Sequence, residues 1–287
     1  MSLAFEEVRL SLPHIELAAH LYGPEDGRPV IALHGWLDNA ATFAHLAPRL
    51  HGVRIVALDF AGHGHSDHRP AGTDYALWAY AHDVLMVAEQ FGWQRFSMLG
   101  HSMGAITAVL LAAAVPERIE RLALIDGLLP YTSEADEAPA KLGDALRAKL
   151  ALEGKRKPVY ADLERAVKAR MTGIGAVSYE AAELLARRGL MPVPGGYTWR
   201  SDARLTLPSP LRLSRAHAEA FVRALQCPVS LVLAEQGMVL AQPQLETLLA
   251  SLPFDIHRLP GGHHLHLNDE TGAQRVADCF NPFLGSP

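Results

Sequence analysis

Residues 97–106 read SMLGHSMGAI, which places Ser102 in a Gly-x-Ser-x-Gly motif between two apolar runs. The first run is typical of a buried strand and the second of a buried helix. A sharp strand-to-helix corner strains its central residue, and glycines at 100 and 104 leave room for neighbouring backbone. The hydroxyl of Ser102 is therefore expected to stand clear of the sheet. The amide of Met103, at the helix N-terminus, is expected to face an oxyanion formed on an acyl group attacked by Ser102.

The same alternation extends outward from this motif. Compact apolar runs end in Gly or a polar residue, as strands covered on both faces do; they read PVIALHG, VRIVALDF, RFSMLGHS, RLALIDG and VSLVLAEQ. Segments with helical spacing separate several of them, for example residues 76–92 and 105–120. This pattern predicts an α/β fold with a mostly parallel central sheet flanked by helices.

The alternation of strand-like and helical segments stops after Asp126 and Gly127. Residues 128–212 are rich in Ala, Arg, Lys and Glu with helical periodicity, and strand-like sequence resumes at CPVSLVLAE. We therefore predict a helical cap at 128–212, inserted into a core formed by residues 1–127 and 213–287. The insert holds 14 Lys/Arg and 10 Asp/Glu, a net charge of +4, and the remainder carries −9. Opposite charges favour docking of the two parts, and a basic insert also suits anionic substrates.

Composition excludes several classes of function. The net charge of −5 argues against a nucleic-acid binder, which needs a basic footprint. The sequence has no apolar run of membrane-spanning length, and its first residues do not resemble a signal peptide. Two cysteines, Cys227 and Cys279, imply no disulfide framework and favour reduced thiols in a cytoplasmic protein. The oligomeric state is left open.

A second loop complements the serine motif. LHGWLDNAATF follows the strand PVIAL, and its His-Gly pair lets the backbone bend so that the amide of Trp36 faces the same point as that of Met103. The side chain of Trp36 is a candidate wall of the substrate pocket. His34 is interpreted as a residue that braces the loop, and His63 and His65, in DFAGHGHSD, as structural residues.

These stretches carry a resemblance that covers nearly the full chain. HGWLDNAATF, DFAGHGHS, LGHSMG and the cap stretch ELLARRG…GGYTWRSDARL resemble the serine hydrolase-like proteins of the capped α/β-hydrolase superfamily. The resemblance implies the fold, a Ser–acid–His triad, two backbone donors to an oxyanion and no cofactor. It does not imply a substrate.

Three histidines in GGHHLHLND, residues 261–269, are candidates for the base. The superfamily places its base on a loop after the last strand, in a Gly-His pattern that aligns with His263. His264 and His266 are expected to be wall residues or supporting residues, because only one imidazole can reach the hydroxyl. A metal site is disfavoured, since the usual zinc spacing is absent.

The acid departs from the commonest pattern. Many relatives carry it in a Gly-x-x-Asp turn, but the corresponding stretch here reads Ala234-Glu235-Gln236-Gly237. Asp126 ends the strand next to that of the nucleophile, and adjacent parallel strands finish at the same edge of a sheet. We therefore favour Asp126 as the residue that orients His263, with Glu235 as the rival.

The resulting hypothesis is a serine hydrolase that cleaves a small or medium carboxylic ester through an acyl-enzyme on Ser102. Leu128, Leu129 and Tyr131, at the entry to the cap, are predicted pocket residues. Thioesterase or lactonase chemistry on the same triad, or a ligand-binding protein without turnover, are the alternatives. The basic run Lys155–Lys157 could meet a phosphate-bearing acyl carrier.

Overall fold

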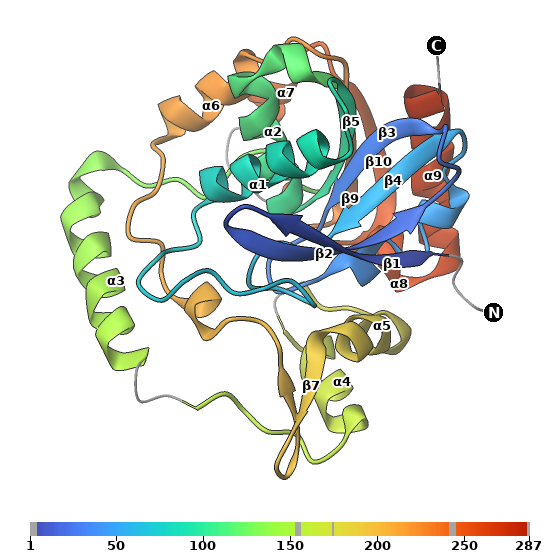
Figure 1. Cartoon of the computed structure of the whole chain (residues 1–287). Helices are drawn as coiled ribbons and strands as arrows, with labels where there is room; N and C mark the ends of the chain where they lie inside the picture. Colours follow the sequence, from blue (N-terminus) through green and yellow to red (C-terminus); the bar gives the residue numbers. More distant parts are fainter. Residues whose placement is uncertain (1–4, 153–155, 174, 241–244, 286–287) are drawn as a thin grey trace.

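The computed structural model describes residues 5–152, 156–173, 175–240 and 245–285. Eight strands form one sheet in the order β1-β2-β4-β3-β5-β6-β9-β10, and all pairs from β4 to β10 are parallel. The strands span Glu6–Leu12, Ile15–Tyr22, Arg28–Leu33 (β3), Val53–Leu58 (β4), Phe96–His101 (β5), Ile119–Ile125 (β6), Val229–Gln236 (β9) and Asp255–Gly262 (β10). This sheet confirms the predicted fold class (Figure 1).

The N-terminal strands are an addition to the predicted fold. β1 and β2 form an antiparallel hairpin, and β2 pairs antiparallel with β4 at the edge of the sheet. Strand β1 alternates exposed and buried residues over its second half, whereas β2 is almost wholly buried. The hairpin extends the sheet beyond the strands that the sequence reading identified.

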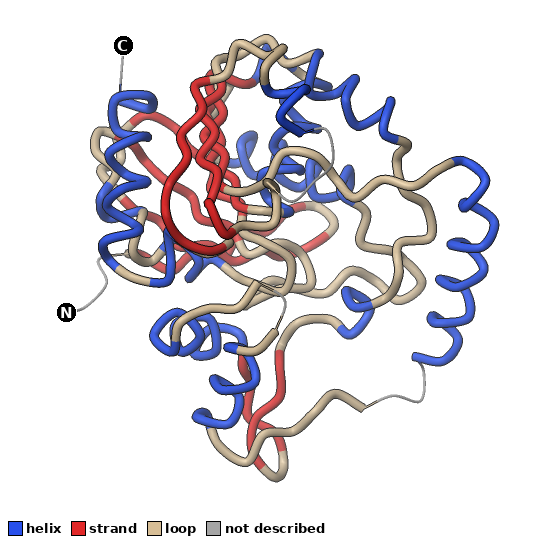
Figure 2. Tube along the Cα trace, turned by 180° about the vertical axis from the view of Figure 1, so that it is seen from behind, coloured by secondary structure: helices blue, strands red, loops and turns tan. Residues whose placement is uncertain are grey.

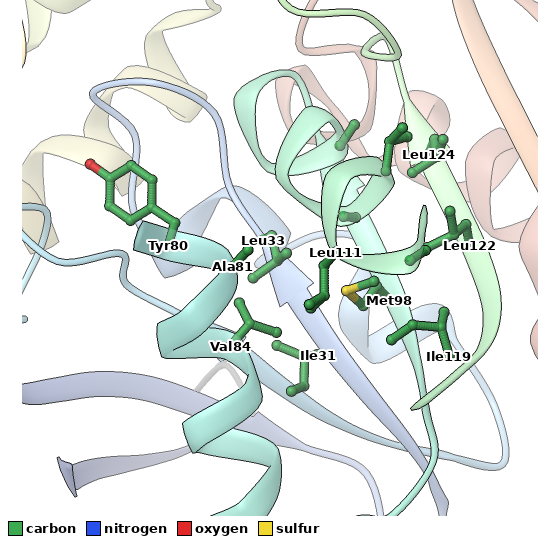
Figure 3. Packing of buried hydrophobic residues seen from close by; sticks show 14 of the residues in the cluster. Ile31, Leu33, Tyr80, Ala81, Val84, Met98, Leu111, Ile119, Leu122 and Leu124 are labelled. Atoms are coloured by element: carbon green, nitrogen blue, oxygen red, sulfur yellow. The ribbon is translucent and has the colours of Figure 1, made fainter. Parts of the chain in front are cut away.

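Helices cover both faces of the sheet (Figure 1). One face carries α1 (Leu77–Gln90), α2 (Met103–Ala114), α6 (Arg215–Arg223) and α7 (Leu245–Leu249); α8 (Leu265–Asn268) and α9 (Glu270–Gly285) lie on the other side. Figure 3 shows side chains of α1 and α2 packed against those of β3, β5 and β6. Apolar residues on both faces of the central strands explain why these strands read as continuous hydrophobic runs.

The part of the chain from α3 to β8, between β6 and β9, lies outside the sheet layers (Figure 2). It contains α3 (Ala138–Leu152), α4 (Leu163–Met171) and α5 (Tyr179–Gly189), followed by a hairpin of β7 (Leu190–Val193) and β8 (Gly196–Trp199). The sequence predicts a helical cap, and the structure adds this hairpin, which was not foreseen, to its helices. Gly195 and Gly196 adopt φ of 92° and 142°, which L-residues with side chains rarely do, and so reverse the chain.

None of the helices in the described ranges is long and apolar enough to cross a membrane.

Candidate active site

Ser102 occupies a strained corner between β5 and α2. Its φ and ψ are 52° and −116°, and its amide donates a hydrogen bond to the carbonyl of Ile125 over 3.1 Å. A Cβ atom at Gly100 would lie 2.5 Å from Cα of Ala105, and one at Gly104 would lie 2.0 Å from the carbonyl oxygen of Leu33. Both positions therefore require glycine for the helix to approach the strands this closely.

Asp126 follows β6 at the same edge of the sheet. Its buried carboxylate accepts hydrogen bonds from the amides of Met238 (2.9 Å) and Ala234 (3.3 Å), and Nδ1 of His263 lies 2.5 Å from its Oδ2. The next residue, Gly127, has no side chain, and a Cβ there would lie 2.5 Å from the carbonyl oxygen of Ser102. The backbones that carry Ser102 and Asp126 are thus in direct contact.

The turn after β9 encloses the Asp126 carboxylate. A Cβ at Gly237 would lie 2.5 Å from both of its oxygens, so the absence of a side chain at Gly237 makes room for Asp126. Glu235 is exposed near the end of β9, just before this turn. Of the two acids considered from the sequence, the structure brings Asp126 to His263.

His263 follows the last strand, β10, as the sequence pattern anticipates. Its carbonyl oxygen lies 3.0 Å from Nε2 of His101, the residue before Ser102. With Nδ1 at Asp126, its Nε2 remains for another partner. Gly175 of the insert lies against the imidazole ring of His263: a Cβ atom at Gly175 would lie 3.0 Å from Cδ2 of that ring.

The two predicted oxyanion donors lie on neighbouring segments, the start of α2 and the loop after β3. Met103 is the first residue of α2, and its amide is among the first four of the helix, which have no intrahelical acceptor. The loop of Trp36 follows β3 and packs beside the serine corner, since a Cβ at Gly35 would lie 3.1 Å from Nδ1 of His101. His34 braces this loop: its ring donates to the carbonyl of Gly35 (2.7 Å) and accepts from the amide of Phe60 (3.0 Å).

A buried ion pair that the sequence did not reveal lies beneath the site. Asp38, two residues after Trp36, accepts hydrogen bonds from Arg170 of α4 (2.7 Å) and from Nε2 of His264 (2.9 Å). Burial acts to raise the pKa of Asp38, but His264 and Arg170 hold it well below its usual value. Asp38 therefore links three segments: the loop after β3, the histidine loop and the insert.

The other histidines of this loop are buried among aromatic rings. His264 bonds Asp38, and His266 packs with its ring centroid 4.5 Å from that of His101. Burial lowers the pKa of both His101 and His266 well below the usual value and so favours the neutral form of both rings.

One buried group has the residue types of a metal site. The possible ligand atoms of Asp38, His101 and His264 all lie within 4.8 Å of one another. However, Nη2 of Arg170 lies 2.7 Å from Asp38 and 3.4 Å from Nε2 of His264, so a guanidinium already supplies the positive charge there. The hydrogen bonds of this group are those of an ion-pair network.

A cavity of about 370 Å³ lies between the Trp36 loop and the insert. Three of its lining residues are aromatic, three are basic and one is acidic, and the others are aliphatic, small or hydroxyl-bearing; the lining residues are Trp36, Leu37, Leu152, Arg156, Lys157, Pro158, Tyr160, Ala169, Arg170, Gly173, Trp199, Ser201, Asp202, Ala203 and Thr206. Ser102 and His263 do not line it, and Trp36 connects it to the predicted oxyanion loop.

Three of the predicted pocket residues lie elsewhere. Leu128 and Leu129 are buried in the hydrophobic core, because Gly127 turns the chain against the serine corner. Tyr131 is exposed, with the guanidinium of Arg212 5.8 Å from its ring centre. Neither the leucines nor Tyr131 are among the residues that line the cavity.

Comparisons with known proteins identify the family and the fold of the chain. A family model described as the alpha/beta hydrolase fold matches residues 28–157. The chain is 32% identical to a serine hydrolase-like protein of Danio rerio, over 98% of this chain and 89% of the relative. A crystal structure of a hypothetical protein from Pseudomonas aeruginosa PAO1 is 73% identical, with a TM-score of 0.96 over 98% of this chain and 99% of that one. A thioesterase domain from the curacin biosynthetic pathway is 25% identical, with a TM-score of 0.85 over 99% and 100% of the two chains.

Proposed function

The chain belongs to the α/β-hydrolase family, among the serine hydrolase-like proteins, and we propose that it hydrolyses a small or medium carboxylic ester through an acyl-enzyme on Ser102. The contact between His263 and Asp126, beside the strained corner that carries Ser102, is the observation on which this proposal rests. It supplies a base with a fixed tautomer, which a serine hydroxyl needs in order to act as a nucleophile.

The proposed reaction uses these groups in two steps. The hydroxyl oxygen of Ser102 attacks the ester carbonyl carbon while Nε2 of His263 takes the hydroxyl proton. The tetrahedral oxyanion accepts hydrogen bonds from the amides of Trp36 and Met103. Its collapse breaks the bond to the alkoxy group, which leaves as the alcohol with the proton from His263. Water then attacks the acyl-enzyme by the same route and releases the acid.

Asp126 has two proposed roles in this cycle. Because its Oδ2 faces Nδ1 of His263, it holds the imidazole proton on Nδ1 and leaves Nε2 free to accept one. Its negative charge also stabilises the imidazolium that forms when the Ser102 proton moves. The amides of Met238 and Ala234 fix the carboxylate in this position.

Covalent labelling tests the proposal. A fluorophosphonate probe is expected to label the native protein and not the Ser102→Ala variant, and the native protein is expected to release p-nitrophenol from p-nitrophenyl butyrate. Ser230→Ala is a matched control, because Ser230 is buried on β9 away from the serine corner. A folded native protein that is neither labelled nor active on a panel of esters and lactones would favour ligand binding without turnover.

Thioester hydrolysis is a second candidate. The likeness to a thioesterase domain over essentially the whole chain favours it, and a thioester carbonyl would use the same hydroxyl, base and amides. Initial rates on matched butyryl esters and butyryl thioesters separate the two activities.

A further inference from the structure

The cavity between the Trp36 loop and the insert carries an unequal balance of charge. Four ionisable side chains line it: Arg156, Lys157, Arg170 and Asp202. Arg170 is neutralised by Asp38, and Asp202 by Arg204 at 2.6 Å. These two ion pairs leave Arg156 and Lys157 as the remaining cations of the cavity wall.

Among the described residues, no carboxylate forms an ion pair with either of these two cations. Nζ of Lys157 donates to the carbonyl oxygens of Trp199 (2.8 Å) and Ser201 (3.0 Å), which leaves one of its three N–H groups. Arg156 is exposed, and within the described ranges no acidic side chain forms an ion pair with it or with Lys157. Burial lowers the pKa of Lys157, although Asp202 opposes this effect. The cavity thus has a net positive wall.

The rest of the wall includes three aromatic side chains, those of Trp36, Tyr160 and Trp199. The indole N–H of Trp36 donates to the carbonyl of Leu205 (2.9 Å), and that of Trp199 to the hydroxyl of Tyr160 (3.4 Å). Because these polar atoms have partners within the protein, the aromatic residues offer mainly apolar surface. Apolar walls with a few placed polar groups are typical of small-molecule sites.

We propose that the substrate of this protein carries an anionic group, a carboxylate or a phosphate, which binds at Arg156 and Lys157 while its apolar part packs on Trp36, Tyr160 and Trp199. The inference rests on the proposed function, because Trp36 is what joins this cavity to the predicted oxyanion loop. The anion and the scissile carbonyl then belong to one molecule, with the anion held by the insert and the carbonyl by the core.

Matched substrates test the charge preference. Mono-p-nitrophenyl glutarate and p-nitrophenyl pentanoate differ only in a terminal carboxylate or methyl group. Butyryl-CoA and S-butyryl-N-acetylcysteamine differ in the phosphate-bearing part of the leaving group. The anionic member of one pair is expected to have a kcat/KM about tenfold higher, the size of one hydrogen-bonded charge pair. The substrate pair that shows this difference in kcat/KM identifies the anionic group as a carboxylate or as a phosphate. Equal kcat/KM values within both pairs overturn the inference.

Variants locate the effect. Arg156→Gln is expected to remove most of the preference by raising KM, and Arg156→Lys to retain it. Arg165→Gln is the matched control, because Arg165 is an exposed arginine of the insert that does not line the cavity. A preference that survives Arg156→Gln unchanged would place the anion elsewhere. Lys157 is a weaker choice for substitution, since it also holds the carbonyls of Trp199 and Ser201.

Binding without turnover separates this inference from the proposed function. Calorimetry with glutarate and with coenzyme A on the Ser102→Ala protein is expected to show saturable binding of one of them, weakened about tenfold by Arg156→Gln and by added salt. If this binding occurs but no ester or thioester is cleaved by the native protein, the proposed function fails and the anion site stands. If neither compound binds, the anion site fails.

Discussion

Replacing Asp126 by Asn is the sharpest test of the proposed triad. Three N–H groups face the carboxylate, from Ala234, Met238 and His263, so every hydrogen bond requires an acceptor. An amide has only one oxygen, and its NH₂ group must face at least one of these donors. If the NH₂ group lies at the Oδ2 position, it opposes both His263 and Met238.

The size of the effect follows from these contacts. If the amide oxygen stays toward His263, the variant loses a charge-assisted hydrogen bond of about 1.5–3 kcal/mol, which corresponds to about 10- to 150-fold in kcat. If the amide turns, His263 is driven into the wrong tautomer, a change that costs a serine protease about 10⁴-fold. We therefore expect kcat to fall at least tenfold, with KM little changed.

The assay compares Asp126→Asn, after β6, with Glu235→Gln, near the end of the neighbouring strand β9. Initial rates on p-nitrophenyl butyrate and the rate of fluorophosphonate labelling are measured for both, and circular dichroism and thermal unfolding check that each is folded. Glu235 is exposed, so its variant is expected to keep nearly native rates. A folded Asp126→Asn protein with native kcat, or a greater loss in Glu235→Gln, would refute the reasoning.

Three further predictions concern packing, the ion pair and pH. Gly237→Ala is expected to displace the Asp126 carboxylate, because the methyl group would lie 2.5 Å from its oxygens, and to lower kcat at least tenfold; Gly262→Ala, with open space around it, is the control, and equal kcat values would contradict the prediction. Arg170→Gln leaves the buried charge of Asp38 without its cation and is expected to lower the free energy of unfolding by about 3–5 kcal/mol in urea titrations, part of which Asp38→Asn should restore in the double variant. Stability is expected to fall as the pH drops below about 6.5, because burial lowers the pKa of several histidines in the folded protein. Below that pH the unfolded chain binds protons that the folded protein does not. At one pH unit below about 6.5, each such histidine lowers the free energy of unfolding by up to about 1.4 kcal/mol. Urea midpoints that are equal at pH 7.5 and 5.5 would contradict it; the histidines are His20, His34, His63, His101 and His266.

The central fold could be predicted because its strands are buried on both faces. Their apolar runs are bounded by turns and separated by helical segments, and the confirmed sheet contains all five of them. The N-terminal hairpin was missed because β1 begins with two exposed glutamates and offers only a short alternation. The β7–β8 hairpin was missed although Gly195-Gly196 is a turn signal, since Ala- and Arg-rich sequence before it favours helix.

The candidate site was predictable to the extent that it depends on strand ends. Ser102, Asp126 and His263 each follow a parallel strand, and such strands end at one edge. Their catalytic roles stay predictions. Leu128 and Leu129 are buried in the hydrophobic core, and their role as walls of the substrate pocket stays a prediction.

Contacts between segments that are distant in the chain leave no local pattern in the sequence, so they could not be predicted from it. Arg170 and Asp38 are 132 residues apart, and each reads as an ordinary charged residue of a helix or a loop. The aromatic and basic wall of the cavity likewise combines the Trp36 loop with residues near 156–160 and 199–203. Such sites arise from how the insert packs on the core, which spacing along the chain does not encode.

The Arg170–Asp38 pair has a consequence for how small molecules reach the interior. Lifting the whole insert off the core would separate Arg170 from Asp38 and break their hydrogen bond, so we expect an open state of this kind to be sparsely populated. Substrate and products are therefore expected to enter and leave through the existing cavity beside Trp36. This requires rotations of side chains and no hinge motion of the whole insert.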